Sequence, residues 1–201
     1  MDARERAIAM RELARMYHQW GINIVPLGPD KRPVITGVSR ASGKPLRFLW
    51  EDWAETPQTD SLFAEILRPA WWGDVYGIAG ICGPVSGNLV CIDFDATTFD
   101  TVAGYLGAAG LPESYSWLVK SPGGGWHIWV RTQQLPELDK GKLRRPAKDG
   151  VGFVEFRWHG HYTALPGTTT NAATHPPTGG VYAWVNVENQ DMAPGAIMAQ
   201  A

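Results

Sequence analysis

The sequence is poor in cysteine and has no apolar run long enough to cross a membrane. Its two cysteines, Cys82 and Cys91, lie in apolar surroundings and form no Cys-x-x-Cys pair. This spacing argues against a disulfide framework and against a zinc site, so we expect two buried thiols. The N-terminus begins as a charged helix without an apolar signal core. We therefore expect a cytoplasmic protein with no membrane partner.

An excess of basic charge is also missing. The 201 residues carry a formal net charge of -2, and only 19% of them are charged. A protein that holds duplex nucleic acid over a broad surface needs many more cations, so any contact with nucleic acid should be local. Hydrophobic residues make up 44% of the chain, which suffices for the core of one domain or of two tightly packed lobes.

Tryptophan, in contrast, is abundant, with ten residues in the chain. The middle of the sequence contains Trp71, Trp72, Trp117, Trp126, Trp129 and Trp158. These side chains could form a surface on which bases or sugars stack, but in a β-rich protein they more often fill the core. We favour core filling for most of them.

Hydrophobic spacing predicts secondary structure along most of the chain. Helices are expected over residues 3–20, 60–67 and 97–109, and strands over 22–27, 75–83, 88–95, 116–120, 126–131, 151–158, 162–166 and 182–187. Since only a short turn separates 75–83 from 88–95, we expect these two strands to pair as a hairpin.

The stretch 88–95 organises the rest of the chain, because an apolar strand there ends in two carboxylates. Asp93 and Asp95 are two residues apart and share a face, while Phe94 points the other way. Two carboxylates so close repel each other unless a divalent cation such as Mg²⁺ or Mn²⁺ lies beside them. The alternative is a strand end that runs into a turn, with Asp95 as the N-cap of the next helix.

A glycine-rich segment connects two later strands. Ser121 is followed by Pro122 and three glycines, of which Gly124 and Gly125 lie just before His127. Such a segment can approach a ligand closely and turn its backbone N–H groups towards a phosphate, and an imidazole beside it could bind the same group. A plain hairpin turn and an ordinary sheet histidine are the alternatives. Lys31, in a turn after an early strand, is a weaker candidate for the same anion.

A third candidate element is the strand over 151–158, on which Glu155 and Arg157 share a face. Glu155 could complete a metal cage with the two aspartates, and Arg157 could neutralise a phosphate. A simple salt bridge between the two residues is the alternative. The preceding segment 140–148 contains five cations in nine residues, and we expect a flexible loop that contacts nucleic acid through Lys142, Arg144 and Arg145.

Together these elements suggest nucleotidyl transfer. Three carboxylates would hold two divalent ions about 3.5–4 Å apart, one activating a hydroxyl and the other steadying the leaving pyrophosphate. The glycine segment, its serine and histidine, and the arginine would hold the triphosphate in line.

Three motifs of the sequence resemble, in their order, those of the archaeo-eukaryotic primase superfamily. They are Asp93-Phe94-Asp95, Ser121 to His127, and Val154 to Arg157. The nearest match is its primase–polymerase (Prim-Pol) branch, and the similarity covers roughly residues 8–170. It implies a mixed α/β or α+β fold with two lobes, one of them like an RNA-recognition motif, and an active site between two sheets. Residues 1–190 would form this single catalytic domain, and 191–201 a flexible tail or the start of a linker.

The resemblance also implies roles for individual residues. Asp93, Asp95 and Glu155 would be catalytic ligands of two Mg²⁺ or Mn²⁺ ions. Ser121 and His127 would contact the triphosphate, and Arg157 and Lys31 would face the incoming nucleotide. The implied partners are a single-stranded DNA template, a primer and nucleoside triphosphates, with a helicase or an accessory helical domain. The sequence departs from the superfamily in having Glu155 where an aspartate is common.

Two functions of other kinds compete with a primase–polymerase. A metal-dependent nuclease could use the same acids and His127 on a phosphodiester, but it would not need a triphosphate loop. A non-catalytic single-strand DNA-binding or replication-initiation module could use the tryptophans and the segment 140–148 without metal or nucleotide.

Overall fold

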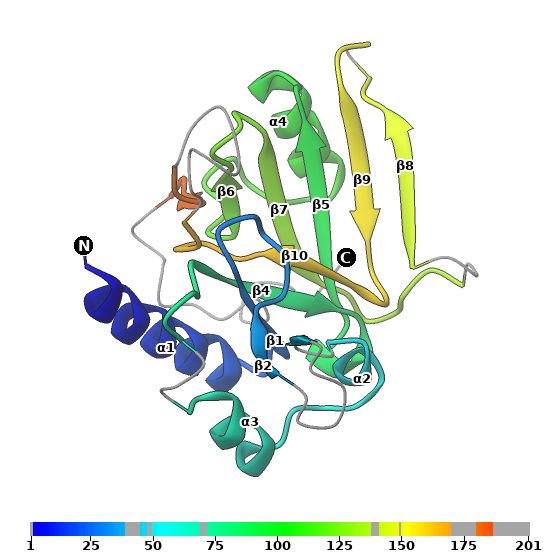
Figure 1. The fold of residues 1–201 in the computed structure, drawn as a ribbon. Coiled ribbons are helices and arrows are strands. Elements are labelled where there is room, and N and C mark those ends of the chain that lie inside the picture. Colours follow the sequence, from blue (N-terminus) through cyan, green and yellow to red (C-terminus); the bar gives the residue numbers. More distant parts are fainter. Residues whose placement is uncertain are drawn as a thin grey trace.

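The computed structural model describes residues 2–38, 45–47, 50–68, 72–137, 141–148, 150–169 and 180–186. Its first element is helix α1 (Ala3–Gln19), which begins at a capping box because Asp2 and Glu5 each bond the backbone N–H of the other. Met10, Ala14 and Tyr17 are buried along one side of this helix, and Figure 1 shows it beside the smaller of the two main sheets.

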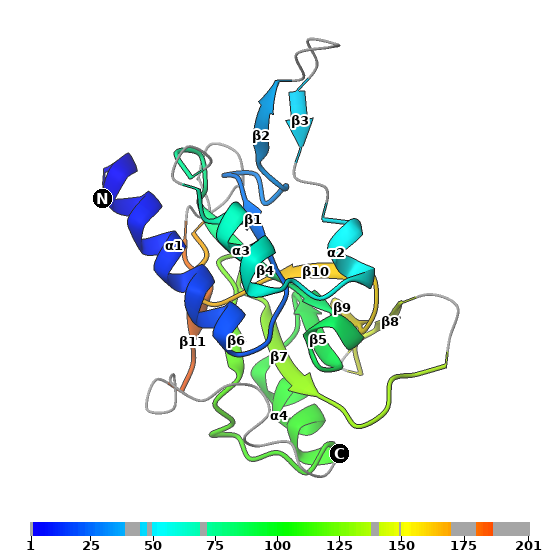
Figure 2. The same cartoon turned by 90° about the horizontal axis from the view of Figure 1, so that it is seen from below.

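The smaller sheet has three antiparallel strands in the order β1 (Ile24–Leu27), β4 (Gly77–Cys82) and β10 (His161–Ala164). Two short helices, α2 (Asp52–Glu55) and α3 (Asp60–Ile66), lie near it with α1. Figure 2 shows a separate hairpin of β2 (Ile35–Val38) and β3 (Pro45–Arg47) that projects away from this lobe.

The larger sheet is also antiparallel and has six strands. Their order is β11 (Ala183–Trp184), β6 (Leu118–Lys120), β7 (Trp126–Arg131), β5 (Leu89–Asp95), β9 (Phe153–Arg157) and β8 (Lys142–Pro146). Helix α4 (Phe99–Ala108) packs on one face, where the rings of Phe94 and Tyr105 lie 5.2 Å apart. Since Asp93 and Phe94 point to opposite faces, the acids lie on the face turned towards the smaller sheet (Figure 1).

The prediction of a mixed α+β fold with two sheets is confirmed, and the three expected helices end within a few residues of their predicted limits. Core filling by tryptophan is confirmed for Trp72, Trp117, Trp129 and Trp158, all of which are buried. Cys82 and Cys91 are buried and unbridged, as expected. In the part of the chain that the structure describes, no helix is long and apolar enough to span a membrane. The expected tail over 191–201 lies outside the described residues.

The predicted hairpin between 75–83 and 88–95 is reduced to one antiparallel bridge, between Gly83 and Leu89, because β4 and β5 otherwise belong to different sheets. The chain crosses between the sheets through a short 3-10 turn, η2 (Pro84–Ser86). Gly83 has φ 124°, and Gly87 and Asn88 have φ 67° and 56°. These left-handed conformations turn the chain out of the plane of β4, so the short link joins two layers instead of two neighbouring strands.

The flexible loop expected over 140–148 is also wrong, because residues 142–146 form the outermost strand β8. This strand pairs with β9 over its whole length, with Leu143 opposite Phe156. Its charged side chains suggested a loop, but backbone pairing with β9 determines the structure. Charged residues are common on the outermost strand of a sheet, where they oppose edge-to-edge association.

Candidate active site

Three of the predicted residues form a row across the middle of the larger sheet. Asp93 on β5 pairs directly with His127 on β7 and with Glu155 on β9. Because residues paired across antiparallel strands point to the same face, all three side chains face the smaller sheet. Strand pairing thus brings together side chains that are far apart in the sequence.

Asp93 is the more buried of the two carboxylates in the row, with only 9% of its surface exposed. Its Oδ1 lies 3.4 Å from Nε2 of His127, and its Oδ2 accepts a hydrogen bond of 2.8 Å from Nη2 of Arg157. Burial by itself would raise the pKa of Asp93. The hydrogen bond from His127 and the positive charges of His127, Arg157 and Lys31 outweigh burial, so the pKa is lowered and the carboxylate is ionised at neutral pH.

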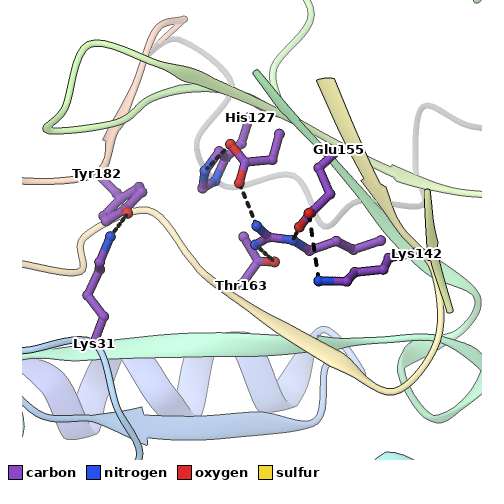
Figure 3. Close-up of polar contacts among 8 residues, drawn as sticks. Lys31, His127, Lys142, Glu155, Thr163 and Tyr182 are labelled. Carbon is purple, nitrogen blue, oxygen red and sulfur yellow. Dashed lines mark hydrogen bonds and ion pairs between the residues drawn. The ribbon is translucent and has the colours of Figure 1, made fainter. Parts of the chain in front are cut away.

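Arg157 connects the two sheets through its hydrogen bonds, and Figure 3 labels its partners Glu155 and Thr163. From β9 its guanidinium donates to Glu155 on the same strand, to Asp93 on β5 and, at 2.8 Å, to Oγ1 of Thr163 on β10. Burial acts to lower the pKa of Arg157, but the neighbouring carboxylates raise it above its usual value. The predicted face shared by Glu155 and Arg157 is confirmed, and so is the salt bridge given as the alternative reading. Thr163, which no sequence pattern indicated, fixes the far end of the guanidinium.

Asp95 lies two residues beyond Asp93 on the same face, at the exposed end of β5. Its pKa is raised by partial burial and by the charge of Asp93, which outweigh the opposing charges of Arg144, Arg157 and His127. The two aspartates therefore concentrate negative charge at one point of the sheet. Asp95 does not cap the following helix, because the N-cap of α4 is Thr98.

The glycine-rich segment closes tightly against the end of β5. The N–H of Ser121 donates to the carbonyl of Gly125 at 2.9 Å, and Gly124 has φ 87°. A Cβ atom on Gly125 would lie 2.4 Å from the carbonyl oxygen of Phe94, so only glycine allows this approach. The segment is a hairpin turn between β6 and β7, and its position also puts it at the edge of a cavity.

This cavity, which we call the acid cavity, has a volume of about 180 Å³. It is lined by Lys31, Asp93, Asp95, Ala96, Ser121, Gly123, Gly125, His127 and Tyr182. A connected space of about 180 Å³ reaches the smaller sheet and shares Lys31, Asp93, His127 and Tyr182 with it. The structure thus brings the paired aspartates, the glycine segment, His127 and Lys31 together around one cavity. The sequence analysis had assigned these residues to one nucleotide site.

Two features of the acid cavity suit an anionic ligand. His127 lines the cavity, and its buried Nδ1 has no hydrogen-bond partner among the described residues, which leaves its hydrogen-bonding capacity unused in this conformation. Nζ of Lys31 is turned inward and lies 3.3 Å from the hydroxyl of Tyr182. Burial lowers the pKa of this lysine, while Asp93 and Asp95 act to raise it. Tyr182 was missed in the sequence because it lies just before the short strand β11, far along the chain from the other residues.

Glu155 is next to Asp93 in the sheet, but its carboxylate lines another cavity than the paired aspartates do. It is paired with Arg157, and its Oε2 lies 3.7 Å from Nζ of Lys142 (Figure 3). It lines a different cavity, of about 310 Å³, together with Trp50, Lys142, Arg157, His161 and Tyr162. Arg157, which bonds both Glu155 and Asp93, lies between the two carboxylates.

The residues present fit a divalent cation at the paired aspartates, because carboxylate oxygens are the ligands that Mg²⁺ and Mn²⁺ prefer. The repulsion that raises the pKa of Asp95 is the repulsion that such an ion would remove. Within the described ranges, however, no three His, Cys, Asp or Glu side chains are grouped as a metal site. The cage of three carboxylates predicted from sequence is not assembled in this conformation, since the Arg157 ion pairs engage Glu155.

The three predicted nucleic-acid contacts do not share one surface. In the register of β8 and β9, Lys142 lies opposite Arg157 and Arg144 lies opposite Glu155. Lys142 and Arg144 are therefore on the face of the acids. Arg145 pairs with the buried Val154 and so belongs to the face that carries α4. Only the first two are positioned to contact a strand lying over the site.

Comparison with known families agrees with this geometry. Residues 14–196 match the family described as "Bifunctional DNA primase/polymerase, N-terminal", and the chain belongs to this family. The resemblance inferred from the three motifs is thereby confirmed. The family carries out nucleotidyl transfer in general, with DNA and nucleotides as substrates. A comparison with curated proteins gave no match.

Proposed function

We propose that this chain is the catalytic core of a DNA-template-dependent primase–polymerase that acts in replication. The observation that supports the proposal is the acid cavity, in which the aspartates of one strand are brought together with a glycine turn, a histidine and an inward lysine. A nuclease would need the acids but not the glycine turn and the lysine. A non-catalytic binding module would need neither the acids nor the turn with its lysine.

In this proposal the hydrogen-bond donors and cations of the site bind the phosphates, and its carboxylates bind metal. The N–H groups of the glycine turn, Nδ1 of His127 and Nζ of Lys31 bind the triphosphate. Asp93 and Asp95 would hold a divalent ion, which would supply charge neutralisation and activation of a hydroxyl when bound. His127 and Arg157 keep Asp93 ionised, and the hydrogen bond from Arg157 orients its carboxylate.

The two-ion form of the mechanism needs one further step. Glu155 is engaged by Arg157 and Lys142, so it could be a ligand of a second ion only if these contacts were released. A bound triphosphate would offer the guanidinium of Arg157 another anionic partner and would so free the carboxylate of Glu155. The same carboxylates would then change from ion pairing to metal binding.

The experiment that tests the function uses the purified chain, single-stranded DNA, labelled nucleotides and Mg²⁺ or Mn²⁺, with and without a primer. The double variant Asp93→Ala, Asp95→Ala should abolish product, whereas Asp74→Asn, at an exposed aspartate away from the cavity, should not. Equal product from wild type and double variant would refute the proposal. A shortened template would indicate a nuclease, and DNA binding without product would indicate a non-catalytic module.

A further inference from the structure

An exposed aromatic ring lies beside the paired aspartates. Phe153 begins β9, is 44% exposed and pairs directly with Asp95 on β5. Its side chain therefore shares a face with the acids. Single exposed apolar side chains are common on protein surfaces, and exposure alone would carry no argument. The surroundings of this ring are what set it apart.

A cation covers the ring from the neighbouring strand. The guanidinium carbon of Arg144, on β8, lies 4.3 Å from the centroid of Phe153. Arg144 itself is exposed, and its charge also reaches Asp95, whose pKa it acts to lower. An aromatic face and a guanidinium plane are the two protein surfaces on which bases stack, and the guanidinium can also bind a phosphate.

The turn that carries Phe153 is held firmly against the site. Gly152 has φ 73°, and a Cβ atom there would lie 1.9 Å from the carbonyl oxygen of Asp95. The N–H of Ala147 donates to the carbonyl of Gly152 at 3.2 Å. The backbone that leads into Phe153 is therefore packed against Asp95, which limits the conformational entropy lost when a ligand stacks on the ring.

Strand order indicates which ligand the ring would meet. The glycine turn and Lys31 border the acids on the side of β6 and β7, whereas Phe153 and Arg144 border them on the side of β9 and β8. In an in-line displacement the hydroxyl attacks the reacting phosphorus from the side opposite to the leaving pyrophosphate. With the triphosphate on the β7 side, the attacking hydroxyl comes from the β9 side, and the template strand that positions this hydroxyl by base pairing lies on the β9 side too.

We infer that Phe153 and Arg144 form a stacking site for an unpaired base of the single-stranded DNA template, next to the catalytic aspartates. This inference rests on the proposed function. Lys142, on the same face of β8, supplies a further cation for the template backbone. The exposed Val151, at 54%, extends the apolar surface of the turn.

The test measures binding of single-stranded DNA that contains 2-aminopurine, whose fluorescence falls when the base stacks on an aromatic ring. Phe153→Ala should weaken binding about tenfold and abolish the quenching, and Phe153→Trp should restore both. The slope of affinity against salt should stay unchanged in Phe153→Ala, because stacking releases no counterions, but should fall by about one in Arg144→Gln. Phe99→Ala removes a ring that is 36% exposed on α4, and it serves as the matched control.

The outcomes separate this inference from the proposed function. If the wild type binds DNA and extends primers while Phe153→Ala retains affinity and quenching, the stacking site is refuted and the function stands. If the wild type neither binds single-stranded DNA nor incorporates nucleotides, both are refuted. A melting temperature of Phe153→Ala equal to that of the wild type would show that lost binding is not a loss of folding.

Discussion

Nη2 of Arg157 lies 2.8 Å from Oδ2 of Asp93, and this contact joins a carboxylate of the candidate site to the strand that also carries Glu155. The same guanidinium reaches Thr163 on the other sheet. One side chain thus neutralises the central acid of the site, engages the third acid and links the two lobes. Its removal should affect stability and metal binding in opposite directions.

Arg157→Ala should lower the free energy of unfolding by about 3 kcal/mol, because a partly buried carboxylate loses its partner. Urea denaturation measures this loss. The exposed pair of Arg68 and Glu65 provides the control, and Arg68→Ala should cost less than about 1 kcal/mol. Millimolar Mn²⁺ should restore more stability to Arg157→Ala than to the wild type, since the ion then binds carboxylates without a competing guanidinium. Equal effects of Mn²⁺ on both proteins would argue against competition for these acids.

The two aspartates should respond to pH with opposite signs. The pKa of Asp95 is raised in the folded state, so ionisation of this group costs stability as pH rises through the interval between its unfolded and folded values. The pKa of Asp93 is lowered, so its contribution is present above the unfolded value and is lost as pH falls through the folded value.

Near neutral pH, therefore, Asp95→Asn should raise the melting temperature and Asp93→Asn should lower it. Both effects should disappear at a pH low enough to protonate both carboxyl groups. Thermal scans of the wild type, the two variants and Asp74→Asn between acid and neutral pH would measure them. A lower melting temperature for Asp95→Asn at neutral pH would contradict the repulsion between the two aspartates.

The glycine turn offers a matched pair of substitutions. In Gly125→Ala the new Cβ would meet the backbone of Phe94 at 2.4 Å, so the turn must move away from the acid cavity. The KM for nucleotide should rise at least tenfold, with a loss of about 1–3 kcal/mol in stability from overpacking. At Gly123 a Cβ meets nothing within 4 Å, and Gly123→Ala should change neither quantity much. Steady-state kinetics on a primed template would measure the KM for nucleotide of both variants. An unchanged KM for Gly125→Ala would show that the turn does not bind the nucleotide.

Strand register also predicts which cations contact the template. Lys142→Gln should reduce the salt dependence of DNA binding by about one unit of slope, because this residue lies on the face of the acids. Arg145→Gln should leave the slope unchanged, since Arg145 belongs to the opposite face. Fluorescence anisotropy over a range of salt concentrations measures both. Equal slopes for the two variants would mean that the template does not follow this face.

The sequence allowed prediction of those parts of the site that depend on local geometry. The shared face of Asp93 and Asp95 follows from the two-residue period of a strand, and the turn before His127 follows from its glycines. The row formed by Asp93, His127 and Glu155 could be expected only through resemblance to a family, because strand pairing between distant segments has no local signature. For the same reason Tyr182 and Thr163 were missed.

The two errors in the fold have a similar cause. The link between β4 and β5 is short enough for a hairpin, but its left-handed residues direct it into another layer. The charged segment 142–146 has the composition of a loop, yet β9 offers it a complete set of backbone partners. In both cases tertiary pairing overrode a reasonable local preference.

The order in which the strands are synthesised has a consequence for biogenesis. The smaller sheet is built from β1, β4 and β10, and β10 begins only at His161, after β5, β6, β7, β8 and β9 of the larger sheet have been made. During synthesis, β4 therefore has only β1 as a partner until β10 has been made, while most strands of the larger sheet are already present. The lobes cannot be separated by cutting the chain at one point, and a product truncated before His161 would expose an open strand edge to self-association.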